Sequence, residues 1–395
     1  MQFPRNVLIA TAASLLTDIS SEMIVYVLPI FLSGVLQTPM ALIGLIEGVA
    51  ETTASFTKLA SGYLSDRLKN RKIPVVFGYT LSTIVKAFLV FVTSWQGVFA
   101  IRTIDRLGKG LRTAPRDALI ADSVDETQRG AAFGFHRAGD TLGAFIGVGL
   151  ALLIILWSSQ TSLSAQTFRT LVLVSMIPAT LAVILLIFGL KEPKRTKEVT
   201  TIATLSIPFK QNFKVFLGIV ALFSLGNSAD AFIVLLAKER GASLVIILAM
   251  VLSFNLVYTL AAQPLGKLSD QIGRQKLIIA GWLVYAAVYL GLAFSNQVWQ
   301  VWILWAFYGL YYALSEGAIK ALIADVVDKE QRGTAYGWLN AVVGFMALPA
   351  SFLAGILWQN LTPMAPFLFG ACTAILSLFG LIAFTSLHKT SVINH

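Results

Sequence analysis

The stretch ALIADSVDETQRG, residues 118–130, occurs a second time in the chain as ALIADVVDKEQRG, residues 321–333. A second pair of motifs follows nearly the same spacing, because GYLSD at residues 62–66 recurs as GKLSD at residues 266–270, one residue further apart. Two polar motifs that repeat in register indicate that a whole unit of about half the chain is duplicated. Two repeats of this kind are a common plan for transporters, with a binding site near the membrane midplane.

Long apolar segments separate these motifs. The chain has 395 residues, of which 56% are hydrophobic and 13% are charged, whereas soluble domains are about 25% charged. A helix needs about 20 apolar residues to cross a bilayer, and it satisfies its own backbone hydrogen bonds there. We therefore predict an all-α membrane protein with twelve transmembrane helices in two six-helix bundles, near residues 6–34, 41–65, 74–94, 97–121, 129–157, 167–190, 211–236, 243–267, 276–295, 298–324, 332–358 and 364–387.

Charge outside the segments predicts the topology. The net charge of +10 comes mostly from Lys and Arg in alternate loops, so it does not indicate nucleic-acid binding. The positive-inside rule then places both termini in the cytoplasm of a bacterial inner membrane, with Lys238–Arg240 as the one exception. The polar stretch 191–210 is predicted to be a cytoplasmic linker between an N-terminal bundle, 1–190, and a C-terminal bundle, 211–395. The first apolar segment is longer than a signal-peptide core, so we interpret it as a transmembrane helix.

Charged residues inside the apolar segments are the first candidates for function, because each costs roughly 3 kcal/mol or more in a bilayer. Segments 6–34 and 41–65 each carry two acids one helical turn apart. In segment 97–121, charged residues that are mostly basic recur every three or four residues, so they lie along one side of the helix. A carboxylate can carry a proton if burial and a neighbouring guanidinium act on its pKa in opposite directions. The proton-coupling candidates are Asp18, Glu22, Glu47, Glu51, Arg106, His136 and Asp140. The alternative is that these groups pair with one another and lock the first bundle, and His136 is equally well explained as a hydrogen-bond partner.

Basic and aromatic side chains suggest a substrate cavity. An Arg without a compensating acid attracts anions, and its fork suits carboxylate or phosphate. Glu316 and Lys320 are four residues apart, so a plain intrahelical ion pair is the alternative for them. The cavity candidates are Tyr26, Lys109, Arg112, Arg137, Asp230, Asn255, Tyr258, Tyr308, Tyr312, Glu316, Lys320, Trp338 and Asn340.

The repeated loop motifs are predicted to form a cytoplasmic gate, in which acids cap helix ends or pair with Arg. Arg112 and Arg116 fit either this gate or the substrate cavity. The gate candidates are Gly62, Asp66, Arg67, Arg71, Arg116, Asp117, Asp122, Arg129, Gly266, Asp270, Arg274, Asp325 and Arg332. Three glycines at a spacing of four, Gly139, Gly143 and Gly147, predict a tight helix contact.

These motifs resemble the major facilitator superfamily over the whole chain. Gly266, Asp270, Gly273 and Arg274 are similar to its loop motif, and Arg106 with Gly110 is similar to its Arg motif, with Lys109 in place of the common Gln. The glycines of segment 129–157 resemble the motif of its proton-driven antiporters, with Ala144 in place of Pro. The string DRLGKGLRTAPRDALIAD, residues 105–122, is typical of a bacterial subgroup. The resemblance implies two bundles related by pseudo-two-fold symmetry that tilt about a central site.

The function predicted from these features is secondary active transport by alternating access. We expect proton-coupled export of a small polar, anionic or zwitterionic solute, such as a metabolite, metal chelator or drug. The alternatives are proton-coupled import of a similar solute and, from another class, a sensor or scaffold. An enzyme is not expected, because the sequence has no HExxH motif, no P-loop and one Cys, Cys372. We expect no cofactor or metal, because the proton gradient would drive transport. The expected partners are the solute, protons and the bilayer, and the protein is expected to be a monomer.

Overall fold

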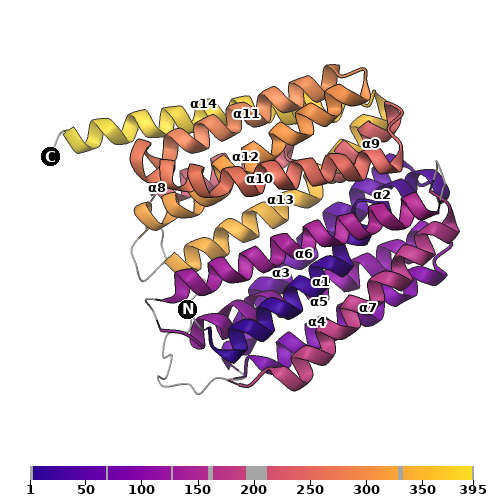
Figure 1. Cartoon of the computed structure of the whole chain (residues 1–395). Helices are drawn as coiled ribbons and strands as arrows, with labels where there is room; N and C mark the ends of the chain where they lie inside the picture. The colour runs from indigo at the N-terminus through magenta and orange to yellow at the C-terminus, as the bar shows by residue number, and fades with distance from the viewer. Residues whose placement is uncertain are drawn as a thin grey trace. The chain divides into compact units, whose positions relative to one another are not determined.

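The computed structural model describes residues 3–67, 70–125, 128–158, 163–192, 211–327 and 332–393, which are helical almost throughout (Figure 1). Most of the predicted linker therefore lies outside the described residues. The first repeat contains α1 (Arg5–Val25), α2 (Leu28–Ile30), the π-helical turn η1 (Phe31–Val35), α3 (Met40–Arg67), α4 (Lys72–Ala87), the 3-10 turn η2 (Phe88–Phe91), α5 (Trp95–Asp122), α6 (Arg129–Trp157) and α7 (Ala165–Gly189). The second contains α8 (Gln211–Gly226), α9 (Ala231–Glu239), α10 (Leu244–Ile272), α11 (Arg274–Phe294), α12 (Val298–Val326), α13 (Arg332–Asn360) and α14 (Ala365–Ile393).

Each of the twelve predicted segments corresponds to one helix or to one interrupted helix, so the predicted fold class is confirmed. Among the described residues, nine of these helices are long and apolar enough to cross a membrane on length and composition alone. The other three are α3, α5 and α12. Charged side chains lower the hydropathy of α3 and α5, while Trp and Tyr lower that of α12.

The chain divides into two compact units. The first unit comprises Met1–Thr38, Val49–Ala203 and Ser243–Leu248, and the second comprises Pro39–Gly48, Thr204–Ala242 and Ala249–His395. The start of α3 thus belongs to the second unit, and the start of α10 belongs to the first.

The same packing pattern occurs inside each unit. In the first unit, α1 packs mainly on α6 and α7, while α4 packs on α5 and α7. In the second unit, α8 packs on α13 and α14, while α11 packs on α12 and α14. These partners correspond one to one in the two repeats, so the duplication seen in the sequence is also a duplication of helix packing.

The leading helix of each repeat is interrupted at the same repeat position. In the first repeat, α1 ends at Val25, and Pro29 lies in the short α2 that follows. In the second repeat, residues 227–230 separate α8 from α9. Interrupted helices leave backbone polar groups for other partners, and in transporters they occur where ions and substrates bind.

Buried side chains fix the helices of the first unit around α1. One cluster joins Ala13 of α1 to Val75 and Tyr79 of α4, Leu119 of α5 and Leu186 of α7. This packing determines which faces of α1, α4 and α5 remain for the charged groups.

Candidate functional site

The acids of α1 lie directly against the glycines of α6. A Cβ added at Gly143 would stand 2.5 Å from the carbonyl oxygen of Leu15 and 3.1 Å from Cβ of Asp18. A Cβ added at Gly147 would stand 2.5 Å from the carbonyl oxygen of Ile19 and 3.1 Å from Cβ of Glu22. Helices approach this closely only where one side chain is absent. The glycine face therefore sets the position of both carboxylates.

Gly139 continues this contact by one turn and brings His136 to α1. A Cβ at Gly139 would lie 2.6 Å from the Thr11 methyl group. The Thr11 hydroxyl and Nδ1 of His136 form a hydrogen bond of 3.4 Å, and Nε2 of His136 lies 3.7 Å from Oδ1 of Asp140. Thr11, His136 and Asp140 thus form a second polar group on the α1–α6 contact.

Three bases of α5 face the acids of α1 and α3. Arg106 is only 8% exposed, and its Nη2 lies 3.5 Å from Oε1 of Glu51. The carboxylates of Asp18 and Glu22 both interact electrostatically with Lys109, and Glu22 also interacts with Arg106 and Arg102. The structure therefore brings the acid–base set of the first unit together, and Lys109 interacts with all three carboxylates.

Glu47 lies in a different environment from Glu51, although they are one turn apart in α3. Glu47 is buried and belongs to the part of α3 that is grouped with the second unit. Glu51 belongs to the first unit, and 46% of its side chain is exposed. The two acids therefore differ in burial.

The last two bases of α5, Arg112 and Arg116, have different partners from Arg106 and Lys109. The guanidinium of Arg112 lies 4.1 Å from the centre of the Tyr79 ring of α4, which is a cation–π contact. Arg116 donates to the Ser14 hydroxyl at 3.0 Å and to Oδ1 of Asp117 at 2.8 Å. Arg112 and Arg116 thus join α5 to α4 and α1, while Arg137 is exposed on α6.

Lys86 of α4 is a buried cation that the sequence interpretation assigned no role. It is 6% exposed, and its Nζ donates to the hydroxyls of Ser20 at 2.8 Å and Ser21 at 3.1 Å. A cavity of about 30 Å³ beside it is also lined by Arg102 and Asp105. A signal was present in the sequence, since Lys86 is a charged residue inside the apolar segment 74–94.

Repeated Arg residues hold the repeated ALIAD motifs. Nε of Arg71 lies 3.4 Å from Oδ2 of Asp122, and Nη1 of Arg71 donates to the Ser65 hydroxyl at 2.7 Å. At the same repeat position, Arg274 donates to the Ala321 carbonyl oxygen at 2.8 Å. In the first unit, a Cβ at Gly62 would lie 3.4 Å from Cβ of Ala114. The side chains of the other gate candidates lie outside the described residues, namely Asp66, Arg67, Arg129, Asp270, Asp325 and Arg332.

Tyrosines surround the interruption between α8 and α9. The Tyr308 hydroxyl lies 3.2 Å from both Oδ1 of Asn227 and Oδ1 of Asp230, and it donates to them. The Tyr285 hydroxyl donates to the Gly226 carbonyl oxygen at 3.0 Å. Tyr285, which was not among the predicted residues, also stacks on Tyr289, with 4.1 Å between the ring centres. Tyr26, at the corresponding interruption of the first repeat, is half-buried.

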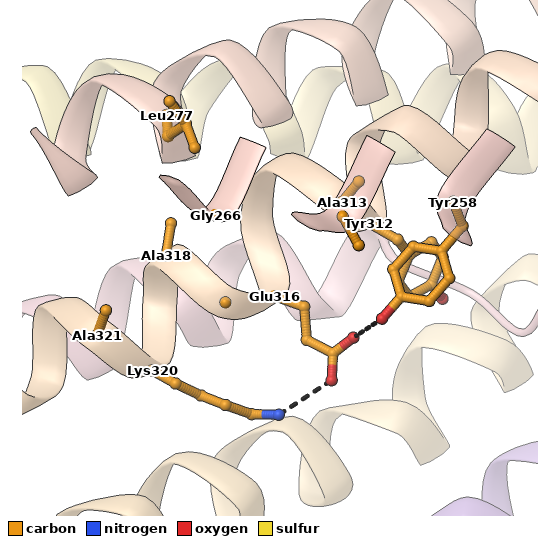
Figure 2. Close-up of a pocket in the computed structure, with 11 residues that line it drawn as sticks. Tyr258, Gly266, Leu277, Tyr312, Ala313, Glu316, Ala318, Lys320 and Ala321 are labelled. Carbon is orange, nitrogen blue, oxygen red and sulfur yellow. Dashed lines mark hydrogen bonds and ion pairs between the residues drawn. The ribbon is translucent and has the colours of Figure 1, made fainter. Parts of the chain in front are cut away.

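A cavity of about 290 Å³ lies among α10, α11 and α12 of the second unit (Figure 2). At one end, the Tyr258 hydroxyl donates to Oε2 of Glu316 at 2.9 Å, and Nζ of Lys320 donates to Oε1 at 2.9 Å. Tyr312 also lines the cavity. The other predicted residues of this unit do not line it, namely Asp230, Asn255, Tyr308, Trp338 and Asn340. The amide of Asn340 donates to the Tyr336 carbonyl oxygen at 2.8 Å.

Two six-helix repeats with buried charges on membrane-length helices define a multi-pass membrane transporter. The model of the major facilitator superfamily matches residues 10–252 and 215–393. The chain is 35% identical to the MFS-type transporter MJ1317 of Methanocaldococcus jannaschii, over 95% of the chain and 94% of the relative. It is 25% identical to the multi-drug resistance efflux pump PmrA of Streptococcus pneumoniae, over 98% of each protein. The chain therefore belongs to the major facilitator superfamily.

The fold is also that of solved members of this superfamily. The crystal structure of the POT family transporter PepTSo superposes with a TM-score of 0.80 at 12% identity and covers 99% of each chain. This likeness concerns the fold alone. Because the superfamily consists of transporters, the expectation that the chain is not an enzyme is confirmed. Among the described residues, no group of three or more His, Cys, Asp and Glu side chains could hold a metal ion.

Proposed function

We propose that the chain exports a small polar, anionic or zwitterionic solute in exchange for protons, by alternating access across a bacterial cytoplasmic membrane. The observation that carries the proposal is the placement of Asp18 and Glu22. They lie between the glycine face of α6 and the cations of α5, and both interact with Lys109. A carboxylate at a tight helix contact and beside shared cations changes its protonation when either neighbour moves. Helix movement during transport would then load and release a proton.

Two features support export as the direction. PmrA, which matches almost the whole chain, is named an efflux pump. Gly139, Gly143 and Gly147 of α6 resemble the glycine motif of the proton-driven antiporters in this superfamily. The basic loops support cytoplasmic termini, with the Arg71–Asp122 pair at the cytoplasmic end. An importer would use the same coupling groups, so the direction has to be measured.

The test uses everted membrane vesicles with an acidic interior, with leucine, citrate and ethidium as a zwitterion, an anion and a cation. For an exporter, the transported probe enters the vesicles and dissipates the pH gradient at the same time. We expect Glu22→Gln to abolish both signals and to leave probe binding intact, because the amide keeps the size but carries no proton. The matched control Glu239→Gln changes an exposed acid at the end of α9 and retains both signals.

Each other outcome contradicts part of the proposal. Probe entry that is unchanged in Glu22→Gln removes Glu22 from coupling. Entry that occurs only into right-side-out vesicles, with an acidic exterior, replaces export by import. Entry of a probe without any change in the pH gradient excludes proton coupling for that solute.

A further inference from the structure

The cavity among α10, α11 and α12 has an uneven lining. Six of its eleven lining residues are Ala or Gly, and the charged groups, Glu316 and Lys320, lie together on α12 (Figure 2). Leu277 and Tyr312 complete the apolar part. The volume of about 290 Å³ is at the small end of ligand pockets, which span about 300–1,000 Å³ for drug-sized molecules. The space therefore suits a ligand with a short apolar part and one charged end.

The glycines of this cavity leave space and are not needed for helix packing. A Cβ at Gly266 or Gly317 would meet no atom within 4 Å. In contrast, a Cβ at Gly309, also on α12, would stand 2.7 Å from the Phe254 carbonyl oxygen. Gly309 is thus required by the α10–α12 contact, whereas Gly266 and Gly317 keep the cavity open.

Glu316 is held from two helices, which distinguishes it from a surface residue in an intrahelical pair. Nζ of Lys320 donates to one carboxylate oxygen at 2.9 Å, and the Tyr258 hydroxyl of α10 donates to the other at 2.9 Å. The Tyr258 and Tyr312 rings meet edge to face at 6.3 Å. The carboxylate is therefore fixed at the cavity wall, with an ammonium group beside it and aromatic rings next to it.

We infer that this cavity binds the charged end of a zwitterion of amino-acid to dipeptide size, with its ammonium group on Glu316 and its carboxylate on Lys320. The inference rests on the proposed function and names the substrate class of the transporter. An anion alone would leave Glu316 without its cation, and a cation alone would leave Lys320 without its anion. A zwitterion replaces both partners at once, so neither Glu316 nor Lys320 is left without an opposite charge. The apolar part of the ligand then lies over Ala313 and Leu277.

The test measures binding to the purified full-length protein by isothermal titration calorimetry, with probes that share one side chain. Leucine and leucyl-leucine are zwitterions, leucine methyl ester is a cation, and N-acetyl-leucine is an anion. We expect at least one of the two zwitterions to bind, with an affinity at least about tenfold higher than the ester and the acetyl compound. Equal binding of the ester overturns the inference in favour of a cation site. Absence of binding by both zwitterions at millimolar concentration also overturns it.

Variants assign the binding to this cavity. Glu316→Gln and Lys320→Gln each lower zwitterion affinity at least about tenfold. The exchange Glu316→Lys with Lys320→Glu restores both charges in reverse order and recovers most of the affinity. Gly317→Leu fills the cavity and abolishes binding, whereas Gly218→Leu on α8, where a Cβ also meets no atom within 4 Å, leaves it unchanged. Unchanged binding in Gly317→Leu, with the thermal unfolding temperature preserved, overturns the assignment.

Failure of this inference and failure of the proposed function give different results. If the zwitterions bind in a Glu316-dependent manner but no probe moves protons, the binding site stands and proton-coupled transport fails. If citrate exchanges with protons in a Glu22-dependent manner while no zwitterion binds, the proposed function stands and this inference fails.

Discussion

The carboxylate of Glu192 accepts backbone hydrogen bonds from the N–H of Arg71 at 2.8 and 3.0 Å. It also accepts one from the N–H of Lys72 at 2.9 Å, so it caps the first turn of α4. The side chain of Arg71, in turn, holds Asp122 and Ser65. Glu192 therefore fixes the backbone of the residue that joins the two loop motifs of the first repeat. Residues 188–191 before it are held by Arg5 and Asn6.

Replacing Glu192 by Ala removes a helix cap, which costs about 0.5–2 kcal/mol in other proteins. We expect a lower thermal unfolding temperature and a smaller loss in Glu192→Gln, because the amide oxygen still accepts hydrogen bonds. Glu239→Ala is the control, since a negative charge at a helix C-terminus is not stabilising. An unfolding temperature equal to wild type in Glu192→Ala would show that the cap does not contribute to stability.

Adding one methyl group to the glycine face of α6 should separate α1 from α6. The Cβ of Gly143→Ala or Gly147→Ala would lie 2.5 Å from a backbone oxygen of α1. We expect destabilisation of about 1–3 kcal/mol, the usual cost of overpacking, together with loss of proton-driven flux. Gly149→Ala is a control on the same helix, because a Cβ there meets no atom within 4 Å. Equal unfolding temperatures for all three variants would contradict the tight contact.

The sequence was sufficient to predict the twelve helices, because long, mainly apolar segments alternate with polar loops. The interruption near Pro29 had a local cause in the proline ring. The interruption at residues 227–230 has no proline, and its stabilising contact with Tyr308 comes from α12. Sequence alone could not identify that contact, since it depends on how α12 packs in the second unit.

The polar side chains were harder to assign than the helices. The stripe on α5 was visible from its spacing, but the spacing does not give the rotation of the helix against its neighbours. Arg106 turns toward Glu51, whereas Arg112 turns toward Tyr79 of α4. Lys86 was passed over because it is a single charge in an apolar segment. Its partners, Ser20 and Ser21, are more than sixty residues away in the sequence.

Lys86 should stabilise the α1–α4 contact through its hydrogen bonds to α1. We expect Lys86→Met to lower the free energy of unfolding by about 1.5–3 kcal/mol, the range for hydrogen bonds that involve a charged group. A double-mutant cycle with Ser20→Ala measures the interaction itself, and we expect an interaction energy of at least about 0.5 kcal/mol. Strict additivity of the two substitutions would mean that the hydrogen bond adds nothing to stability.

The ion pair between Arg106 and Glu51 should be required for coupling rather than for folding. Arg106 is buried and Glu51 is partly exposed, so removing the guanidinium changes the field at Glu51 and at Glu22 together. We expect Arg106→Ala to reduce proton-driven flux to background and Arg106→Lys to retain part of it, because the lysine keeps the charge but loses the fork. The measurement is solute-dependent decay of the pH gradient in vesicles, with the amount of folded protein checked by gel filtration. Normal flux in Arg106→Ala would remove this pair from the mechanism, while loss of folded protein in Arg106→Ala but not in Arg106→Lys would assign the pair to stability.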